Sequence, residues 1–279
     1  MTTCLDQLEP NRVLYLASGH PEALHKTRVA VRRLRSVFSL GSAALAGDDE
    51  AARLKAAIRA AALPLGEARD LDVLLDGPLL APDHPARPAL RLWASAAHDQ
   101  AAATLNDPHW TRLFGDLERW IEQTLIAPTH PGANLDGLET AAAALDRRFR
   151  RVRRASPGVR TMSDLQRHRV RIETKKLRYG VGFFADLFAA PPAQTADFLL
   201  HAERVQTGLG HLQDLVVARR YAQAAAREAM ATSTPDLLSA HRSDVEDAAT
   251  ALRALAAQPP CWPAATRPRQ GRPRSRPDN

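Results

Sequence analysis

The chain has 279 residues, of which 45% are hydrophobic and only 5% aromatic, and its formal net charge at pH 7 is +7. This length is enough for one large domain or two small ones with a hydrophobic core. Cys4 and Cys261 lie near opposite ends, so we expect no disulfide framework, no metal site and no other cofactor. No apolar run approaches 18 residues and no signal-peptide core follows Met1, so we expect a cytoplasmic protein without membrane association.

The predicted elements are all helices. Ala, Leu and Arg dominate the composition, and no stretch alternates apolar and polar residues with β-branched enrichment, which predicts an all-α fold. Pro21 and Gly41 bound the first predicted helix, and Pro64 is expected to end the second. In chain order we expect helices over about 22–40, 49–63, 88–105, 108–126, 136–154, 163–188, 194–208, 214–231 and 235–256. Residues 258–279 are rich in Pro, Arg and Gly, and we expect a disordered tail there that contributes nothing to a core.

Positive charge is concentrated in two places. Residues 147–178 contain thirteen basic and two acidic residues, and residues 267–279 contain five arginines and one aspartate. The region between Tyr179 and the tail is net acidic. Such separated charge makes a strong local field, which attracts polyanions.

An internal repeat is the most informative feature of the sequence. HKTRVAVRRLR, from His25 to Arg35, is followed 143 residues later by HRVRIETKKLR, from His168 to Arg178. LGEARDLDV, from Leu65 to Val73, is followed 144 residues later by LGHLQDLVV, from Leu209 to Val217. Two ordered motifs with nearly equal offsets predict a tandem duplication of a helical unit. The first repeat would span about residues 5–130 and the second about 133–257, in a single domain over 1–257.

Each copy of the first motif places a basic stripe beside an apolar one. On a helix, His25, Arg28, Arg32 and Arg35 fall within about 80° of arc and extend for about 15 Å. Apolar residues on the neighbouring arc are expected to face the core: Leu24, Val31, Leu34 and Phe38. The second copy repeats the stripe with His168, Arg171, Lys175 and Arg178.

A charged helix face is usually only solvated, but this one occurs twice in the same register. Like charges spaced by three and four residues destabilise a helix, and no acidic residue on the stripe relieves their repulsion. Guanidinium and ammonium groups bind phosphate oxygens, so we interpret the stripes as an anion site. Each histidine is either a ligand or a structural hydrogen-bonding group. Arg69, Asp70 and Asp214 follow an expected Leu-Gly turn, and we interpret them as caps or intramolecular ion-pair partners.

The paired HxxRxxx[RK][RK]LR motifs, each followed by LGxxxDxxV, resemble the CHAD family of α-helical domains over about residues 5–255. The resemblance implies two pseudo-symmetric helical bundles enclosing a basic groove or pore. It also implies binding of inorganic polyphosphate and association with polyphosphate granules. The implied ligands are His25, Arg28, Arg32, Arg33, Arg35, His168, Arg171, Lys175, Lys176 and Arg178. Arg59 and Arg151, on neighbouring helices, are further candidates.

Some positions depart from the family pattern. Tyr179 matches the Tyr that often closes the second motif, whereas Ser36 holds that place in the first. Gln213 stands where the second LG motif usually has Asn. The ExExK signature of the triphosphatase domain attached to many relatives does not occur, so we expect a binding module that stands alone.

Two other functions are compatible with parts of the sequence. A nucleic-acid binder would explain the basic segment, and the Arg-rich tail is a candidate for weak contact with nucleic acid, but the motifs lack interleaved aromatic residues for stacking. A histidine phosphatase would need an RHG motif, and Arg169 follows Arg167–His168 instead. We therefore expect no enzymatic activity. If the histidines are ligands, binding should tighten below about pH 6.5.

Overall fold

The computed structural model describes residues 1–130, 132–228 and 238–264, and within them it is helical with no strand. This confirms the predicted all-α class. The helices are α1 (Thr2–Leu5), α2 (Leu8–Ser18), α3 (Pro21–Leu40), α4 (Asp49–Asp76), α5 (Arg87–Asn106), α6 (Pro108–Trp120), α7 (Gly137–Ala155), α8 (Asp164–Phe184), α9 (Pro192–Glu228) and α10 (Leu238–Ala257). A π-helical turn, Ile121–Leu125, extends α6. None of the described helices is long and apolar enough to cross a membrane.

Polar side chains define where several of these helices begin. Asp48 caps α4 by accepting the amide hydrogen of Ala51 at 2.8 Å. Ser163 and Gln166 form a reciprocal capping box at the start of α8. These bonds satisfy backbone N–H groups that have no partner within the helix, and so they favour a helix start at these residues.

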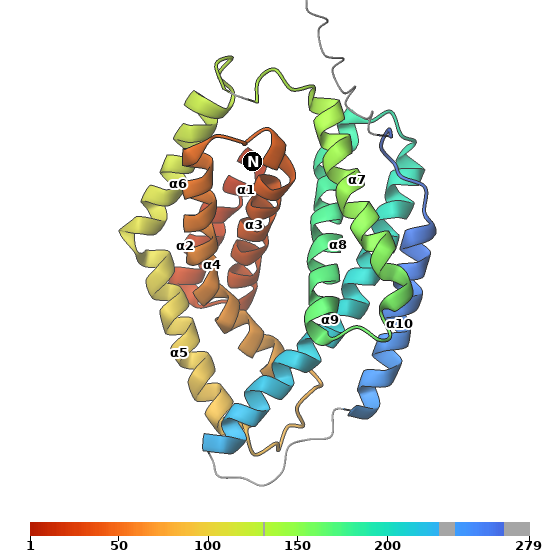
Figure 1. The fold of residues 1–279 in the computed structure, drawn as a ribbon. Coiled ribbons are helices and arrows are strands. Elements are labelled where there is room, and N and C mark those ends of the chain that lie inside the picture. The colour runs from red at the N-terminus through yellow and green to blue at the C-terminus, as the bar shows by residue number, and fades with distance from the viewer. Residues whose placement is uncertain (131, 229–237, 265–279) are drawn as a thin grey trace, which may run out of the picture.

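The helices form two groups, each with its own apolar core. The first group contains α1 to α6 and the second contains α7, α8, α10 and the N-terminal part of α9; they lie on opposite sides in Figure 1. Leu24, Leu34 and Phe38 of α3 are fully buried in the first core, which confirms the predicted apolar stripe. The two groups therefore bury separate faces and meet where α3 packs against α8.

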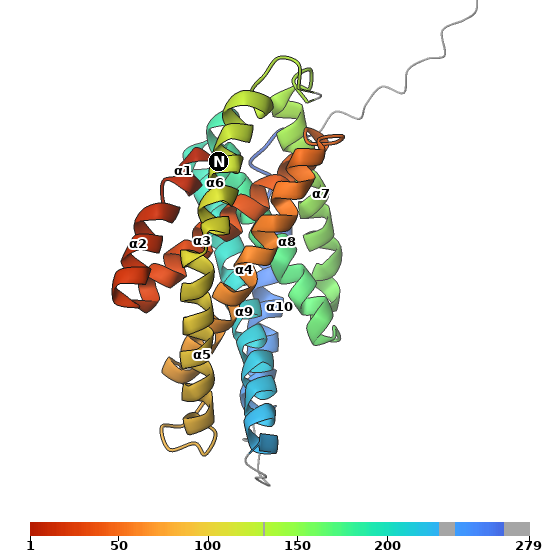
Figure 2. The same ribbon diagram turned by 90° about the vertical axis from the view of Figure 1, so that its left-hand side faces the viewer.

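Helix α9 joins the two groups because it is long enough to contribute to both cores. Its residues Val205 and Leu209 pack in the second core, whereas Ala218, Tyr221 and Ala225 pack in the first. Figure 2 shows its C-terminal part running beside α5, against which it packs. One continuous helix therefore links the two groups, in addition to the contact between α3 and α8.

Two predicted helix breaks are absent. Pro64 lies inside α4, which continues to Asp76 because Leu65, Ala68 and Leu71 beyond the proline are buried in the first core. Packing of this size offsets the few kcal/mol that an internal proline costs a helix. The predicted helices 194–208 and 214–231 are one helix, α9, up to Glu228; residues 229–231 lie outside the described residues, as does the start of the predicted helix 235–256. The Leu-Gly motifs are therefore helical, and the interpretation of the following Asp70 and Asp214 as caps is wrong.

The two ends of the chain also differ from expectation. Helices α1 and α2 were not predicted; Leu5, Leu8 and Tyr15 bury them against the first core. Cys261 and Trp262, assigned to the tail, are buried in the second core, where the indole packs edge-on against Phe149 and Phe198. The expected disorder is therefore wrong for Cys261 and Trp262, because the large apolar side chain of Trp262 packs in the second core. Residues 265–279 lie outside the described residues.

Candidate functional site

The two repeated motifs form two helical hairpins with the same register. In the first hairpin, Arg28 of α3 donates from Nη1 to the carbonyl oxygen of Gly66 in α4 at 2.7 Å. In the second, Arg171 of α8 lies against Gly210 of α9, where a Cβ would be 3.9 Å from its Nε and Nη2 atoms. Arg171 and Gly210 follow Arg28 and Gly66 by 143 and 144 residues. Corresponding residues therefore meet in both hairpins.

A cavity of about 250 Å³ lies where the two hairpins face each other. It draws residues from α3, α4, α8 and α9, which places both repeated motifs around one space. Its lining contains four cationic side chains, two carboxylates and one histidine, but no Phe, Tyr or Trp. The lining residues are Arg28, Arg32, Asp70, Val73, Leu74, Leu79, His168, Arg171, Lys175, Gln213, Asp214 and Val217.

The carboxylates of the cavity neutralise its cations only in part. Asp70 lies 3.6 Å from Nη1 of Arg28, which is a long ion pair. Arg171 has a buried Nε atom without a hydrogen-bond partner among the described residues. Arg32 donates from Nε to the hydroxyl oxygen of Tyr179 at 3.0 Å, a neutral partner that holds the guanidinium in place. Buried donors without partners are costly, so this arrangement leaves room for an anionic acceptor.

Burial and neighbouring positive charges lower the pKa values of Lys175, Arg28 and Arg171. Burial, followed by the charges of Arg171, Arg32 and Arg28, lowers the pKa of Lys175 from 10.5 to about 7. Burial is also the largest cause of the lowered pKa values of Arg28 and Arg171. The raised pKa of Asp214 has the same main cause, and the charge of Arg171 opposes it. A bound anion would raise the pKa values of Lys175, Arg28 and Arg171 again.

The two predicted histidines have different surroundings. His168 lines the cavity, and its Nδ1 atom lies 2.6 Å from Oε1 of Gln213. His25 is not among the lining residues; burial and then the charge of Arg69 lower its pKa below 6.5. Arg69 corresponds to Gln213 in the repeat, so an arginine stands in the first half where an amide stands in the second. The two histidines are therefore not equivalent.

Five of the predicted ligands lie outside this cavity. Arg33 lies over the ring of Tyr179, 5.9 Å from its centroid, and Arg35 is exposed on α3. Lys176 lies 3.9 Å from Glu173, and Arg178 pairs with Glu203 at 3.0 Å. With His25, these side chains belong to the flanks of the site, outside the space that Arg28, Arg32, Arg171 and Lys175 share.

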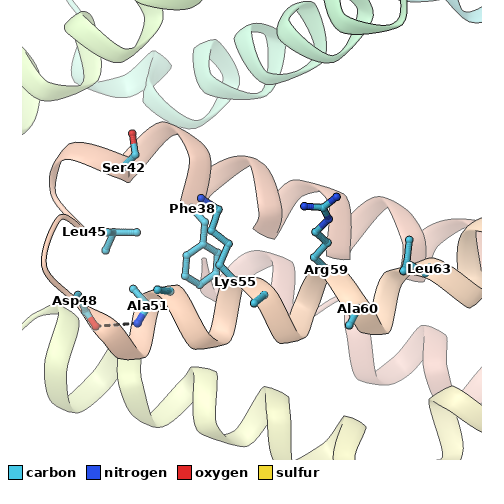
Figure 3. A pocket seen from close by; sticks show the side chains of 11 residues that line it. Phe38, Ser42, Leu45, Asp48, Ala51, Lys55, Arg59, Ala60 and Leu63 are labelled. Atoms are coloured by element: carbon cyan, nitrogen blue, oxygen red, sulfur yellow. Dashed lines mark hydrogen bonds between the residues drawn. The ribbon is translucent and has the colours of Figure 1, made fainter. Parts of the chain in front are cut away.

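The two further candidates occupy different environments. Arg151 is exposed and pairs with Glu173 at 3.2 Å. Arg59 lines a separate, more open pocket of about 540 Å³ between α3 and α4, together with Lys55 and a mainly apolar set that includes Phe38 and Leu63 (Figure 3). Neither residue lines the central cavity.

Sequence reasoning did not assign several lining residues to the site. Asp70 was expected to form an ion pair, and its contact with Arg28 agrees with that alternative. Gln213 and Asp214 also reach the cavity, because α9 continues straight through the second Leu-Gly motif. The repeat itself could have assigned the two carboxylates to the site, because Asp70 and Asp214 recur at the same offset as Gly66 and Gly210.

The comparisons with known proteins agree on one family. The sequence model of the CHAD domain matches residues 1–223. The structure is similar to the crystal structure of the CHAD domain from the plant Ricinus communis, with a TM-score of 0.65 and 30% sequence identity over 92% of this chain and 84% of that chain. A comparison with curated proteins gave no match. The repeated motifs, the helical fold and these two matches together show that the chain belongs to the CHAD domain family.

Proposed function

We propose that this protein binds inorganic polyphosphate in the cavity between the two hairpins. The observation that carries the proposal is the convergence of Arg28, Arg32, Arg171 and Lys175, from two repeated helices, on one space with incomplete neutralisation. Guanidinium groups bind phosphate oxygens with forked hydrogen bonds, and an ammonium group adds a compact point charge. A linear chain of phosphates offers each of these groups an oxygen. Binding of this kind would also support association with polyphosphate granules.

The composition of the lining favours polyphosphate over nucleic acid as the ligand. Single-stranded nucleic acids gain much of their affinity from bases stacked on large aromatic side chains, and no Phe, Tyr or Trp lines the cavity. Duplex DNA would need an extended basic surface rather than a cavity of about 250 Å³. Polyphosphate consists of the charged backbone alone, which the lining can satisfy.

We also infer that the domain binds the polymer without cleaving it. His168 lies beside an amide oxygen of Gln213 rather than a carboxylate, and a neutral acceptor stabilises a positively charged imidazole less than a carboxylate does. Incubation with polyphosphate should release no more phosphate than a heat-inactivated sample. Release that disappears in His168→Ala would contradict this inference.

Calorimetric titration tests the binding proposal. The unmodified protein should bind long-chain polyphosphate at physiological salt, with an affinity that falls steeply as salt rises, and should bind duplex DNA much more weakly. The combined substitution of Arg28, Arg32, Arg171 and Lys175 by alanine should abolish binding. A double variant, Arg91→Ala with Arg112→Ala, removes two exposed arginines that do not line the cavity, and it should bind normally. Circular dichroism must show that each variant folds.

Two results would contradict the proposal. Equal affinity for duplex DNA and polyphosphate would make the cations a general basic surface. Retained polyphosphate binding in the folded fourfold variant would place the site elsewhere. Deletion of residues 265–279 separates any contribution of the Arg-rich tail from that of the cavity.

A further inference from the structure

The two halves of the site differ in charge just outside the cavity. In the second hairpin, Arg178 of α8 pairs with Glu203 of α9 at 3.0 Å and lies 3.4 Å from Oε1 of Gln206. In the first hairpin, the position that corresponds to Arg178 is Arg35, and the position that corresponds to Glu203 is Arg59. The same two positions therefore hold an ion pair in one half and two cations in the other.

Arg35 and Arg59 have no carboxylate partner in the part of the chain that the structure describes. Arg35 and Arg59 are exposed, and neither forms an ion pair with any residue that the structure describes. They are close enough that the charge of Arg59, after burial, helps to lower the pKa of Arg35. Like charges held together on a folded surface are unfavourable unless an anion joins them.

Lys55 extends this group by one helical turn. It lies four residues before Arg59 on α4, and the two side chains extend in the same direction from the helix (Figure 3). Lys55 is also near the second bundle, because its charge, after burial and the charge of Arg148, contributes to the lowered pKa of Lys176 on α8. The residue that corresponds to Lys55 in the second hairpin is Leu199, which is apolar.

The row begins beside the cavity. Arg32 lines the cavity, and Arg35 is three residues further along α3, about 4.5 Å along the helix axis. Arg59 and then Lys55 follow on α4, which packs against α3. Arg35, Arg59 and Lys55 therefore form a continuous basic row, called here the exit row, that leads out of the cavity on one side only.

We propose that a polyphosphate chain bound in the cavity continues along the exit row and not along the corresponding side of α8 and α9. This inference rests on the proposed function, because the chain must first occupy the cavity. Short anions would fill the cavity alone and would not reach the exit row. Long chains would gain additional contacts with Arg35, Arg59 and Lys55, whereas Glu203 would repel them on the opposite side.

Titration with two chain lengths tests the path. The variant Lys55→Ala with Arg59→Ala should bind long-chain polyphosphate roughly fivefold more weakly, as two exposed charge pairs are lost, and should bind tripolyphosphate as the unmodified protein does. Arg91→Ala with Arg112→Ala removes the same charge from α5 and α6 of the same bundle and should change neither affinity. Glu203→Ala should strengthen long-chain binding, because it removes a repulsive carboxylate and frees Arg178.

Each alternative outcome has a definite meaning. The proposed path along the exit row would be wrong if the Lys55/Arg59 variant kept its affinity for long chains. It would also be wrong if the variant lost the same affinity for tripolyphosphate as for long chains. Unchanged long-chain affinity in Glu203→Ala would overturn the one-sided path. Failure of the unmodified protein to bind either length would instead refute the proposed function, and this path with it.

Discussion

Binding of polyphosphate should be accompanied by uptake of a proton on Lys175. In the free protein its pKa is about 7, whereas an ordinary lysine has 10.5. With that pKa, about half of the Lys175 side chains are protonated at pH 7 and roughly one tenth at pH 8. The groups that face it are Arg28, Arg32, Arg171 and Asp214, and a phosphate among them would raise the pKa back towards its ordinary value. Binding at pH 8 should then take up about 0.9 proton.

The affinity should follow the same linkage. The bound state holds more protons than the free state between pH 7 and the pKa of the complex, so affinity falls as the pH rises through this window. The fall approaches about tenfold per pH unit. Below pH 7 Lys175 is already charged, and its contribution levels off.

Calorimetry measures the uptake directly. Titrations at pH 8 in two buffers with different ionisation enthalpies give the number of protons bound, and long chains keep the terminal phosphates, which titrate near neutrality, to a small fraction of the ligand. Lys175→Arg is the matched control, because a guanidinium keeps the charge and does not titrate. This variant should bind without uptake and with a flat profile from pH 7 to 9. Uptake near zero in the unmodified protein, or the same uptake in Lys175→Arg, would refute the reasoning.

Three further predictions concern stability and affinity. Lys175→Met should raise the free energy of unfolding of the free protein by on the order of 2 kcal/mol near pH 7, as measured by chemical denaturation. The folded protein disfavours the charged form of Lys175, so between pH 7 and 10.5 the unfolded chain binds more protons than the folded one. The destabilisation caused by Lys175 is therefore largest below pH 7 and vanishes above pH 10.5. Asp214→Asn should tighten polyphosphate binding by about tenfold in calorimetry, and a weaker complex would show that the carboxylate is needed to position Arg171. Gly208→Ala should lower the melting temperature through a loss of about 1–3 kcal/mol, because its Cβ would lie 3.0 Å from the backbone of Ala248 in α10; an unchanged melting temperature would show that α10 can shift freely.

Much of the local structure could be predicted from residue patterns. The apolar stripe of α3 is buried as expected, because residues three and four apart share one helix face. Pro64 and the Leu-Gly motif at Leu209 misled the prediction, because a local helix breaker was weighed without the packing that follows it. Trp262 was assigned to a tail by the composition around it, and only the site between Phe149 and Phe198 explains its burial.

The sequence by itself determined that the chain is helical and that two basic helices recur in one register, because helix propensity, periodicity and repeat spacing are properties of the chain alone. The tertiary structure decided which cations share a space. Arg171 and Lys175 face Arg28 and Arg32 only because α8 packs against α3. It also decided which cations are neutralised, since Glu203 reaches Arg178 from another helix while Arg59 stands beside Arg35. Charge compensation depends on distance in space and on burial, and neither is contained in the spacing of residues along the chain.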